Sequence, residues 1–453
     1  MMKLIQCCEK QGIFIFIGLI VLLFPFVNTY YLAAAFVGAA LLFSVLSPGS
    51  PAFGFFARES DVKAGKLISL IQLFFTIAFL FIINLAVGQN KFPLFIIGAA
   101  FAITTFGDGV ADAVNILEKA KETGQTHEIK YYSAKSSIVF LISGSLYAFV
   151  AGTWISGFTL KVPDGMLFFL AVIGAITGAL LESMITNDDN IVIPFGSAMV
   201  MWLFYMFGYN VDTVYLMQVL VFSFVLGYLA YKARIADISA MLSATLLGVV
   251  IILSSNKGWF LFSILLAFFL LGSLFTCYKY GYKLARGIAE GKGGARGYKN
   301  VFSNSLAALA LAVAYGIFPA HGQILLAGYL GSVATACGDT LASEIGETYK
   351  GEPRMITTFK KARPGTDGAI SHLGEAAAFF GAFAIAVLAF FFIKKDITLM
   401  IAAAAGGFIG TNIDSVLGAT LQQKGYLSNN GVNLFATISG AIIAGILYSS
   451  MGL

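Results

Sequence analysis

The sequence predicts an all-α polytopic membrane protein. Of its 453 residues, 58% are hydrophobic and only 11% are charged, a balance that a soluble domain of this length does not have. Apolar runs of about 17 to 22 residues recur along the chain, and a helix of that length crosses the hydrocarbon core of a bilayer. The four cysteines show no metal or disulfide spacing and the three histidines are scattered, so we expect neither a zinc centre nor a disulfide framework.

The apolar runs predict about 15 transmembrane helices, with the two termini on opposite sides of the membrane. No small-residue cleavage site follows the first run, so we expect it to remain as a span. The predicted spans are 12–30, 32–48, 67–88, 92–106, 137–156, 165–184, 191–208, 211–231, 238–255, 258–276, 301–318, 322–337, 371–392, 397–413 and 433–451.

The placement of the basic residues predicts the orientation. With a cytoplasmic N-terminus, all but five of the 28 Lys and Arg residues fall in cytoplasmic segments. The five exceptions are Lys91, Lys161, Lys257, Lys394 and Lys395. We therefore expect the charged loops to be cytoplasmic, in the plasma membrane of a prokaryote. The basic connector Tyr278–Asn300 is interpreted as a solvated interfacial helix near anionic headgroups.

The densest charge lies in Cys337–Glu375, between two apolar runs. This segment holds Gly365-Thr-Asp-Gly368, just before the span that begins near Ser371. Glycines let the backbone approach phosphate oxygens, and a helix N-terminus offers free N–H groups. We predict that a nucleotide phosphate chain binds to Arg354, Thr357, Lys360, Lys361, Gly365, Thr366, Asp367, Gly368 and Ser371. The alternative is an ordinary cytoplasmic turn.

The two halves of the chain share an order of features: a Gly-Asp pair that ends an apolar run, a glycine in the next span, and a further acid. They are Asp108, Gly144 and Glu182 in the first half and Asp339, Gly374 and Asp414 in the second. The spacings are 36 and 74 residues in the first half and 35 and 75 in the second. This predicts two related modules in tandem, residues 1–230 and 231–453, with catalytic loops on the cytoplasmic side.

The acids predict bound magnesium. Asp108 and Asp112 are four residues apart, so on a helix they face the same side and repel unless a cation lies between them. Mg²⁺ that carries a nucleotide phosphate satisfies this with one or two carboxylates. Asp339 and Glu344 are the predicted pair of the second half. The alternative is that Asp108 and Asp339 cap helices.

The first half resembles the phytol kinase and dolichol kinase family in two segments, Gly107–Ala151 and Leu181–Phe195. The family's Gly-Asp-Gly-x-Ala-Asp stands at Gly107–Asp112, its Lys-Ser at Lys135-Ser136 and its Asp-Asp-Asn at Asp188–Asn190. The resemblance implies phosphorylation of a polyprenol from CTP. Lys135 and Ser136, with Lys130 upstream, hold the place that the glycine loop has in the second half, so we expect them at the nucleotide. Asp188 or Asp189 is the candidate acceptor of the alcohol's proton. The Arg-Lys-x-x-His that members carry near the N-terminus is absent, because no His precedes His127.

The second half resembles the family of transmembrane protein 19 and phytyl-phosphate kinase, a domain of unknown function numbered 92. The matching segments are Arg296–Asn304, Gly338–Gly346, Pro353–Ser371, Ile413–Gln422 and Asn429–Leu434. The resemblance implies CTP-dependent phosphorylation of a prenyl monophosphate. Because that acceptor is already a phosphate and needs no strong base, we expect Asp414 to bind metal.

Together the two resemblances imply a bifunctional prenol salvage kinase that converts an alcohol of the phytol or geranylgeraniol class to the monophosphate and then to the diphosphate. The expected cofactors are Mg²⁺ and CTP, and the expected partners are prenyl lipids and membrane lipids, without nucleic acid; a homo-oligomer is compatible with this. Two other functions remain open, a cytidylyltransferase that makes a CDP-lipid and a secondary transporter built from repeats. A first half that only scaffolds the second is also open.

Overall fold

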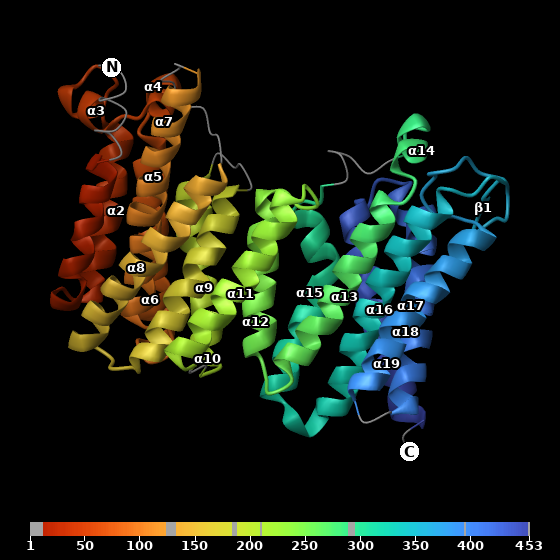
Figure 1. The fold of residues 1–453 in the computed structure, drawn as a ribbon. Coiled ribbons are helices and arrows are strands. Elements are labelled where there is room, and N and C mark those ends of the chain that lie inside the picture. The colour runs from red at the N-terminus through yellow and green to blue at the C-terminus, as the bar shows by residue number, and fades with distance from the viewer. Residues whose placement is uncertain are drawn as a thin grey trace. The chain divides into compact units, whose positions relative to one another are not determined.

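The computed structural model describes residues 12–123, 133–183, 188–208, 211–288, 295–393 and 396–451. In these residues the chain is almost entirely helical, which confirms the predicted fold class (Figure 1). Its contacts divide it into two compact units, Met1–Gln218 and Val219–Leu453. The division falls within α11 (Thr213–Lys232), upstream of the module boundary predicted at residue 230.

Twelve helices of the described residues are long and apolar enough to cross a membrane. Three shorter apolar helices, Gly12–Phe26, Thr29–Val45 and Ile238–Leu253, occupy the remaining predicted spans. The chain is thus an integral membrane protein, and the total of fifteen spans and their orientation stay predictions.

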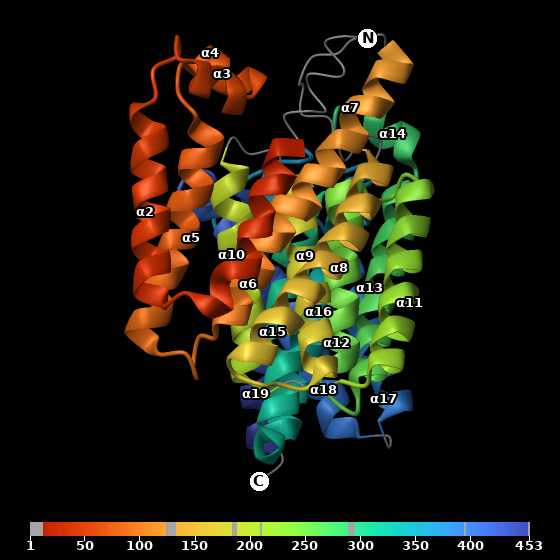
Figure 2. The ribbon, with the colours of Figure 1, turned by 90° about the vertical axis from the view of Figure 1, so that its left-hand side faces the viewer.

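The first unit is a helical bundle with α2 and α5 packed side by side (Figure 2). Its elements are η1 (Leu19–Phe26), α2 (Thr29–Val45), α3 (Pro51–Phe56), α4 (Glu59–Ala64), α5 (Ile68–Val87), α6 (Leu94–Ala102), the π-helical η2 (Ile103–Asp108), α7 (Gly109–Thr123), α8 (Ala134–Phe158), α9 (Asp164–Ser183) and α10 (Asp189–Met206).

The second unit packs α17, α18 and α19 around α16 and adds a two-stranded hairpin, β1 with β2, between α16 and α17 (Figure 1). After α11 its elements are α12 (Ile238–Leu253), α13 (Gly258–Cys277), α14 (Tyr280–Ala285), α15 (Tyr298–Ile317), η4 (Pro319–His321), α16 (Gly322–Gly346), β1 (Arg354–Met355), β2 (Ala369–Ile370), α17 (His372–Phe392), α18 (Ile397–Leu417), η5 (Gly418–Gln422) and α19 (Asn429–Met451).

The predicted spans 92–106 and 322–337 end too early, because both helices continue past their Gly-Asp pairs. α16 continues past Asp339 to Gly346, and the helical path of α6 continues through Asp108 into α7. The glycines serve close packing instead, because a Cβ on Gly338 would lie 2.7 Å from Thr411 Oγ1 and 2.9 Å from the Ala378 carbonyl oxygen. A glycine in a membrane helix lets a neighbouring backbone approach in this way. Both acids therefore lie within the helical bundles rather than in loops.

The same helix pairings occur in both units. In the first unit the α6–η2 helix contacts α8, α9 and α10, and in the second α16 contacts α17, α18 and α19. A Cβ on Gly107 would lie 3.1 Å from Gly144 Cα, and one on Gly381 would lie 3.0 Å from Gly338 Cα. Gly381 therefore matches Gly144, whereas Gly374 faces Gly346, so the equal spacings along the sequence paired the wrong glycines. Residue counting fails here because the segment between α16 and α17 is longer than that between α7 and α8.

Gly338→Ala is expected to lower the free energy of unfolding by about 1 to 3 kcal/mol, because backbone and Thr411 atoms have no room for the new methyl group. Gly38→Ala in α2 is the matched control, since a Cβ there would meet nothing within 4 Å. We expect it to be neutral or to stabilise by up to about 1 kcal/mol. Thermal unfolding in detergent measures both, and equal effects of the two variants would contradict the packing role.

Candidate functional site

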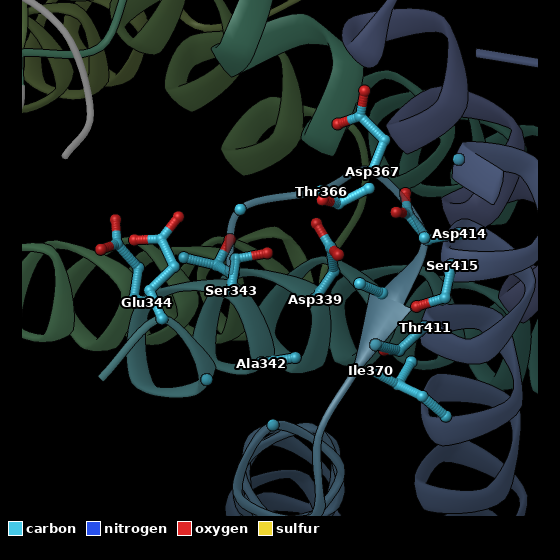
Figure 3. Close-up of a pocket in the computed structure, with 18 of the residues that line it drawn as sticks. Asp339, Ala342, Ser343, Glu344, Thr366, Asp367, Ile370, Thr411, Asp414 and Ser415 are labelled. Atoms are coloured by element: carbon cyan, nitrogen blue, oxygen red, sulfur yellow. The ribbon is translucent and has the colours of Figure 1, made fainter. Parts of the chain in front are cut away.

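A polar cavity of about 290 Å³ lies in the second unit, at the end of the bundle where α16 and α18 meet the hairpin (Figure 3). Of the residues predicted from the sequence for this half, eight line it: Asp339, Glu344, Gly365, Thr366, Asp367, Gly368, Ser371 and Asp414. The lining is mostly polar although Asp339 and Asp414 belong to membrane helices. Polar groups in such positions cost free energy unless they serve a ligand or a network.

Asp339 of α16 and Asp414 of α18 form the centre of this cavity. Their carboxyl groups interact through a hydrogen bond, and Figure 3 shows both side chains beside the loop that carries Thr366 and Asp367. Asp414 Oδ2 is buried without a hydrogen-bond partner among the described residues. Two half-buried carboxyl groups in contact must share either a proton or a cation, since two bare charges repel. The donor set, two carboxylates beside hydroxyl groups, fits Mg²⁺.

The glycine loop adopts a conformation that its two glycines make accessible. Gly365 and Gly368 have φ of +80° and +75°, values that strain other L-residues. A Cβ on Gly368 would lie 2.3 Å from the Ala419 backbone nitrogen, so the loop packs directly onto η5. Gln423 Nε2 donates a hydrogen bond of 2.9 Å to the Asp367 carbonyl oxygen and holds the loop there. The loop thus brings backbone close to the paired acids.

The N-terminus of α17 opens on the same cavity. Ser371 is its N-cap, and its hydroxyl oxygen accepts a hydrogen bond of 3.1 Å from the Gly374 N–H. The positive end of the helix dipole and its remaining first-turn N–H groups favour an anion there. A phosphate at this point would neighbour both the helix terminus and the glycine loop.

The predicted basic residues lie elsewhere. Arg354, Thr357, Lys360 and Lys361 are exposed on the hairpin and do not line the cavity. Lys361 forms an ion pair with Glu352, and Arg354 Nη1 donates a hydrogen bond of 3.2 Å to the Phe359 carbonyl oxygen. Phosphate binding by these four side chains stays a prediction, and the structure places them at the surface because the β1–β2 turn carries them outward.

Glu344, the predicted metal partner of Asp339, has a different partner in the structure. Lys283 Nζ of α14 forms an ion pair with Glu344 Oε2, and Thr276 Oγ1 donates a hydrogen bond of 2.6 Å to Glu344 Oε1. Glu344 lies five residues after Asp339, and Figure 3 shows the two side chains set apart along α16. Lys283 is fully buried and so departs from the interpretation of this segment as a solvated interfacial helix, whereas Leu284, Ala285 and Arg286 are exposed.

Arg296, Asn300 and Asn304 also line the cavity, and sequence reasoning did not select them. Arg296 is 7% exposed and interacts electrostatically with Asp339. Its N–H and carbonyl group are held by the Ile235 carbonyl oxygen and the Asp237 N–H, each at 2.9 Å. The segment Arg296–Asn304 could have indicated them, because it is one of the segments that match the family of the second half. It contains no paired acids, so it was not selected as part of a site.

In the first unit the structure brings three acids together. Carboxylate oxygens of Asp108, Asp112 and Glu182 lie within 4.8 Å of one another, an arrangement that can hold a metal ion. Asp108 and Glu182 are buried, and Arg58 Nη1 lies 3.9 Å from Asp112 Oδ2. The predicted pair thus has a third member on α9, at the position where the second unit has Asp414. No local pattern in the sequence indicated Arg58.

The other predicted residues of the first unit have structural contacts. Lys135 Nζ lies 2.8 Å from Glu118 Oε1, and the Ser136 hydroxyl donates a hydrogen bond of 3.4 Å to the Ala111 carbonyl oxygen. Asp188 accepts a hydrogen bond of 2.8 Å from Gln72 Nε2, and Asp189 is buried in the first turn of α10. Lys130 lies outside the described residues. Nucleotide and proton-acceptor roles for this set stay predictions.

Comparison with known proteins bears on the second half. Residues 221–441 match the family described as integral membrane protein DUF92. An uncharacterised membrane protein of Methanocaldococcus jannaschii is 34% identical over 227 residues, which cover 50% of this chain and 92% of the relative. An uncharacterised membrane protein of Synechocystis is 39% identical over 203 residues, 44% of this chain and 78% of the relative.

A plant protein, the chloroplastic protein VTE6 of Arabidopsis thaliana, is 30% identical over 216 residues, 46% of this chain and 63% of the relative. No solved structure matches the chain. The family match does not extend to the first 220 residues, so their resemblance to polyprenol kinases stays a prediction. The match confirms the resemblance of the second half, and the chain belongs to the DUF92 family of integral membrane proteins.

Proposed function

We propose that the second unit is a lipid phosphotransferase that phosphorylates a prenyl monophosphate from CTP. The observation that carries this proposal is the pair of half-buried acids, Asp339 and Asp414, facing a glycine loop and a helix N-terminus in one polar cavity. Phosphoryl transfer asks mainly for positioning and for neutralisation of charge, which these groups supply. The resemblance to phytyl-phosphate kinases supports the choice of donor and acceptor.

The residues of the cavity divide into two roles. Asp339 and Asp414 would hold Mg²⁺, which when bound would neutralise the negative charge of the transferring phosphate. Backbone N–H groups of Gly365, Asp367 and Gly368 and the N-terminus of α17 would hold the donor phosphates. An ionised oxygen of the acceptor phosphate forms the new bond to the γ-phosphorus while the bond to the CDP oxygen breaks. The acceptor needs no strong base, because a phosphate monoester is already ionised at neutral pH.

We propose that the first unit carries out the preceding step, transfer from CTP to a prenyl alcohol. Asp108, Asp112 and Glu182 would hold a metal ion there, since their carboxylate oxygens converge. The alcohol oxygen bonds to the γ-phosphorus as CDP leaves, and its proton passes to Asp188 or Asp189. Two consecutive steps in one chain would keep the lipid intermediate at a high effective concentration.

A product assay on the purified protein in detergent tests both proposals. Wild-type protein is given γ-labelled CTP, Mg²⁺ and either geranylgeraniol or its monophosphate. We expect labelled monophosphate from the first acceptor, labelled diphosphate from the second, and CDP from both. Release of pyrophosphate would instead indicate a cytidylyltransferase. If neither acceptor gives a product, the secondary transporter is the alternative that remains.

Glu182→Gln is expected to lower phosphorylation of the alcohol by about 10- to 100-fold, as much as Asp108→Asn does, because both side chains belong to one metal site. Transfer to the monophosphate should be unchanged in both variants, which makes that reaction the internal control. Alcohol phosphorylation that survives Glu182→Gln but not Asp108→Asn would remove Glu182 from the site.

A further inference from the structure

A second cavity of about 370 Å³ lies within the second unit, among α11, α12, α13 and α15. Its lining is predominantly apolar and includes Leu226, Ala244, Leu247, Leu265 and Phe268. The volume lies at the lower end of the range for pockets that bind small molecules, about 300 to 1,000 Å³. Protein interiors otherwise fill such space with side chains, so an apolar cavity of this size indicates room for a ligand.

The apolar cavity and the polar cavity share a wall. Arg296, Asn300 and Asn304 line both. The Arg296 guanidinium lies 6.0 Å from the Phe268 ring centroid on the apolar side, and it interacts with Asp339 on the polar side. Asn304 is 3% exposed, and its Oδ1 has no hydrogen-bond partner among the described residues. A cation and an amide at the junction of a polar and an apolar space are suited to the boundary between head and tail of an amphiphile.

The apolar cavity also reaches the outside of the bundle. Leu229 of α11 and Leu270 of α13 line it, and they are 56% and 58% exposed. Both belong to helices apolar enough to span a membrane, so this opening lies on an apolar helix surface. A tail longer than the cavity could therefore extend into the bilayer, and a lipid could enter from the side.

We propose that the apolar cavity binds the hydrocarbon tail of a lipid monophosphate whose phosphate lies in the polar cavity at Arg296. This rests on the proposed function of the second unit and names the site that selects its lipid acceptor. Arg296 and Asn304 mark where phosphate ends and tail begins. The cavity selects for an apolar tail next to the phosphate and not for total chain length, because the far end lies outside it.

The test places a large side chain in the cavity. Ala244→Phe fills it from α12, and Ala267→Phe on α13 is the matched control, since Ala267 lines neither cavity. The probe is a prenyl monophosphate with a photoreactive diazirine in the first isoprene units of its tail, used without nucleotide. Crosslinked peptides are located by mass spectrometry. We expect labelling of α11, α12 or α13 in wild type and in Ala267→Phe, and loss of labelling in Ala244→Phe.

A kinetic measurement accompanies the labelling. Ala244→Phe is expected to raise the KM for geranylgeranyl monophosphate at least about tenfold, the effect of losing about two buried methylene groups, and to leave kcat nearly unchanged. Ala267→Phe should leave both values nearly unchanged. Labelling that is lost only in Ala244→Phe supports the tail site even if no acceptor is phosphorylated, in which case the proposed function alone fails. Labelling outside these helices, or equal labelling and KM in the two variants, overturns the tail site whether or not transfer occurs.

Discussion

Asp339→Asn and Asp414→Asn are each expected to lower kcat for the prenyl monophosphate by about 100-fold or more, and the double variant is expected to be no worse than either single one. The two carboxyl groups contact each other within one cavity, so they act as a unit. Removing either negative charge leaves a site that cannot balance a metal ion and a triphosphate together. Groups that act as a unit lose their joint contribution once, which makes the single effects non-additive.

The measurement is initial rates with γ-labelled CTP for wild type, both single variants and the double variant. Asparagine keeps the shape of aspartate, so thermal unfolding in detergent should show all four proteins folded. Glu352→Gln is the matched control, because Glu352 is an exposed acid outside the cavity. Single losses that multiply in the double variant would show that the two acids act independently and would contradict a shared site.

Lys283→Met is expected to lower the free energy of unfolding by about 3 to 5 kcal/mol. Lys283 is fully buried and Glu344 is 8% exposed, so removal of the lysine leaves a carboxylate with its charge uncompensated. Two carbonyl oxygens also lose their donor, because Lys283 Nζ lies 2.9 Å from the Thr276 oxygen and 3.3 Å from the Phe275 oxygen. This pair ties α14 to α16 and α13 beside the polar cavity.

The double variant Lys283→Met with Glu344→Leu separates charge from packing. Replacing both members of a buried ion pair by apolar residues is often neutral, so most of the lost stability should return. The exposed pair Lys361–Glu352 is the control, and Lys361→Ala should cost less than about 1 kcal/mol. Thermal unfolding in detergent measures all three proteins. A double variant as unstable as Lys283→Met would show that charge compensation is not what the lysine contributes.

By itself, the sequence determined the fold class and the family of the second half. Apolar runs of membrane-spanning length predict helices without knowledge of tertiary contacts, because a bilayer leaves the backbone no other way to satisfy its hydrogen bonds within one segment. The loop Gly365–Gly368 was found for a similar reason, since its glycines and the helix start at Ser371 are local features. Asp108, Asp339 and Asp414 were selected as site residues because they are acids in apolar surroundings. A charge there costs free energy unless it is paired or binds a ligand.

Only the tertiary structure decided which of these groups meet. Asp339 pairs with Asp414, which is 75 residues away along the sequence, and not with Glu344, whose partner is Lys283. Arg296 reaches the cavity because backbone bonds to Ile235 and Asp237 hold it there. Such pairings depend on how helices cross, and small residues such as Gly338 and Gly381 set those crossings through close contacts. The spacing of residues along the chain shows which side chains share a face of one helix. Which side chains meet across the bundle, and what cavity lies between them, depends on how the helices pack.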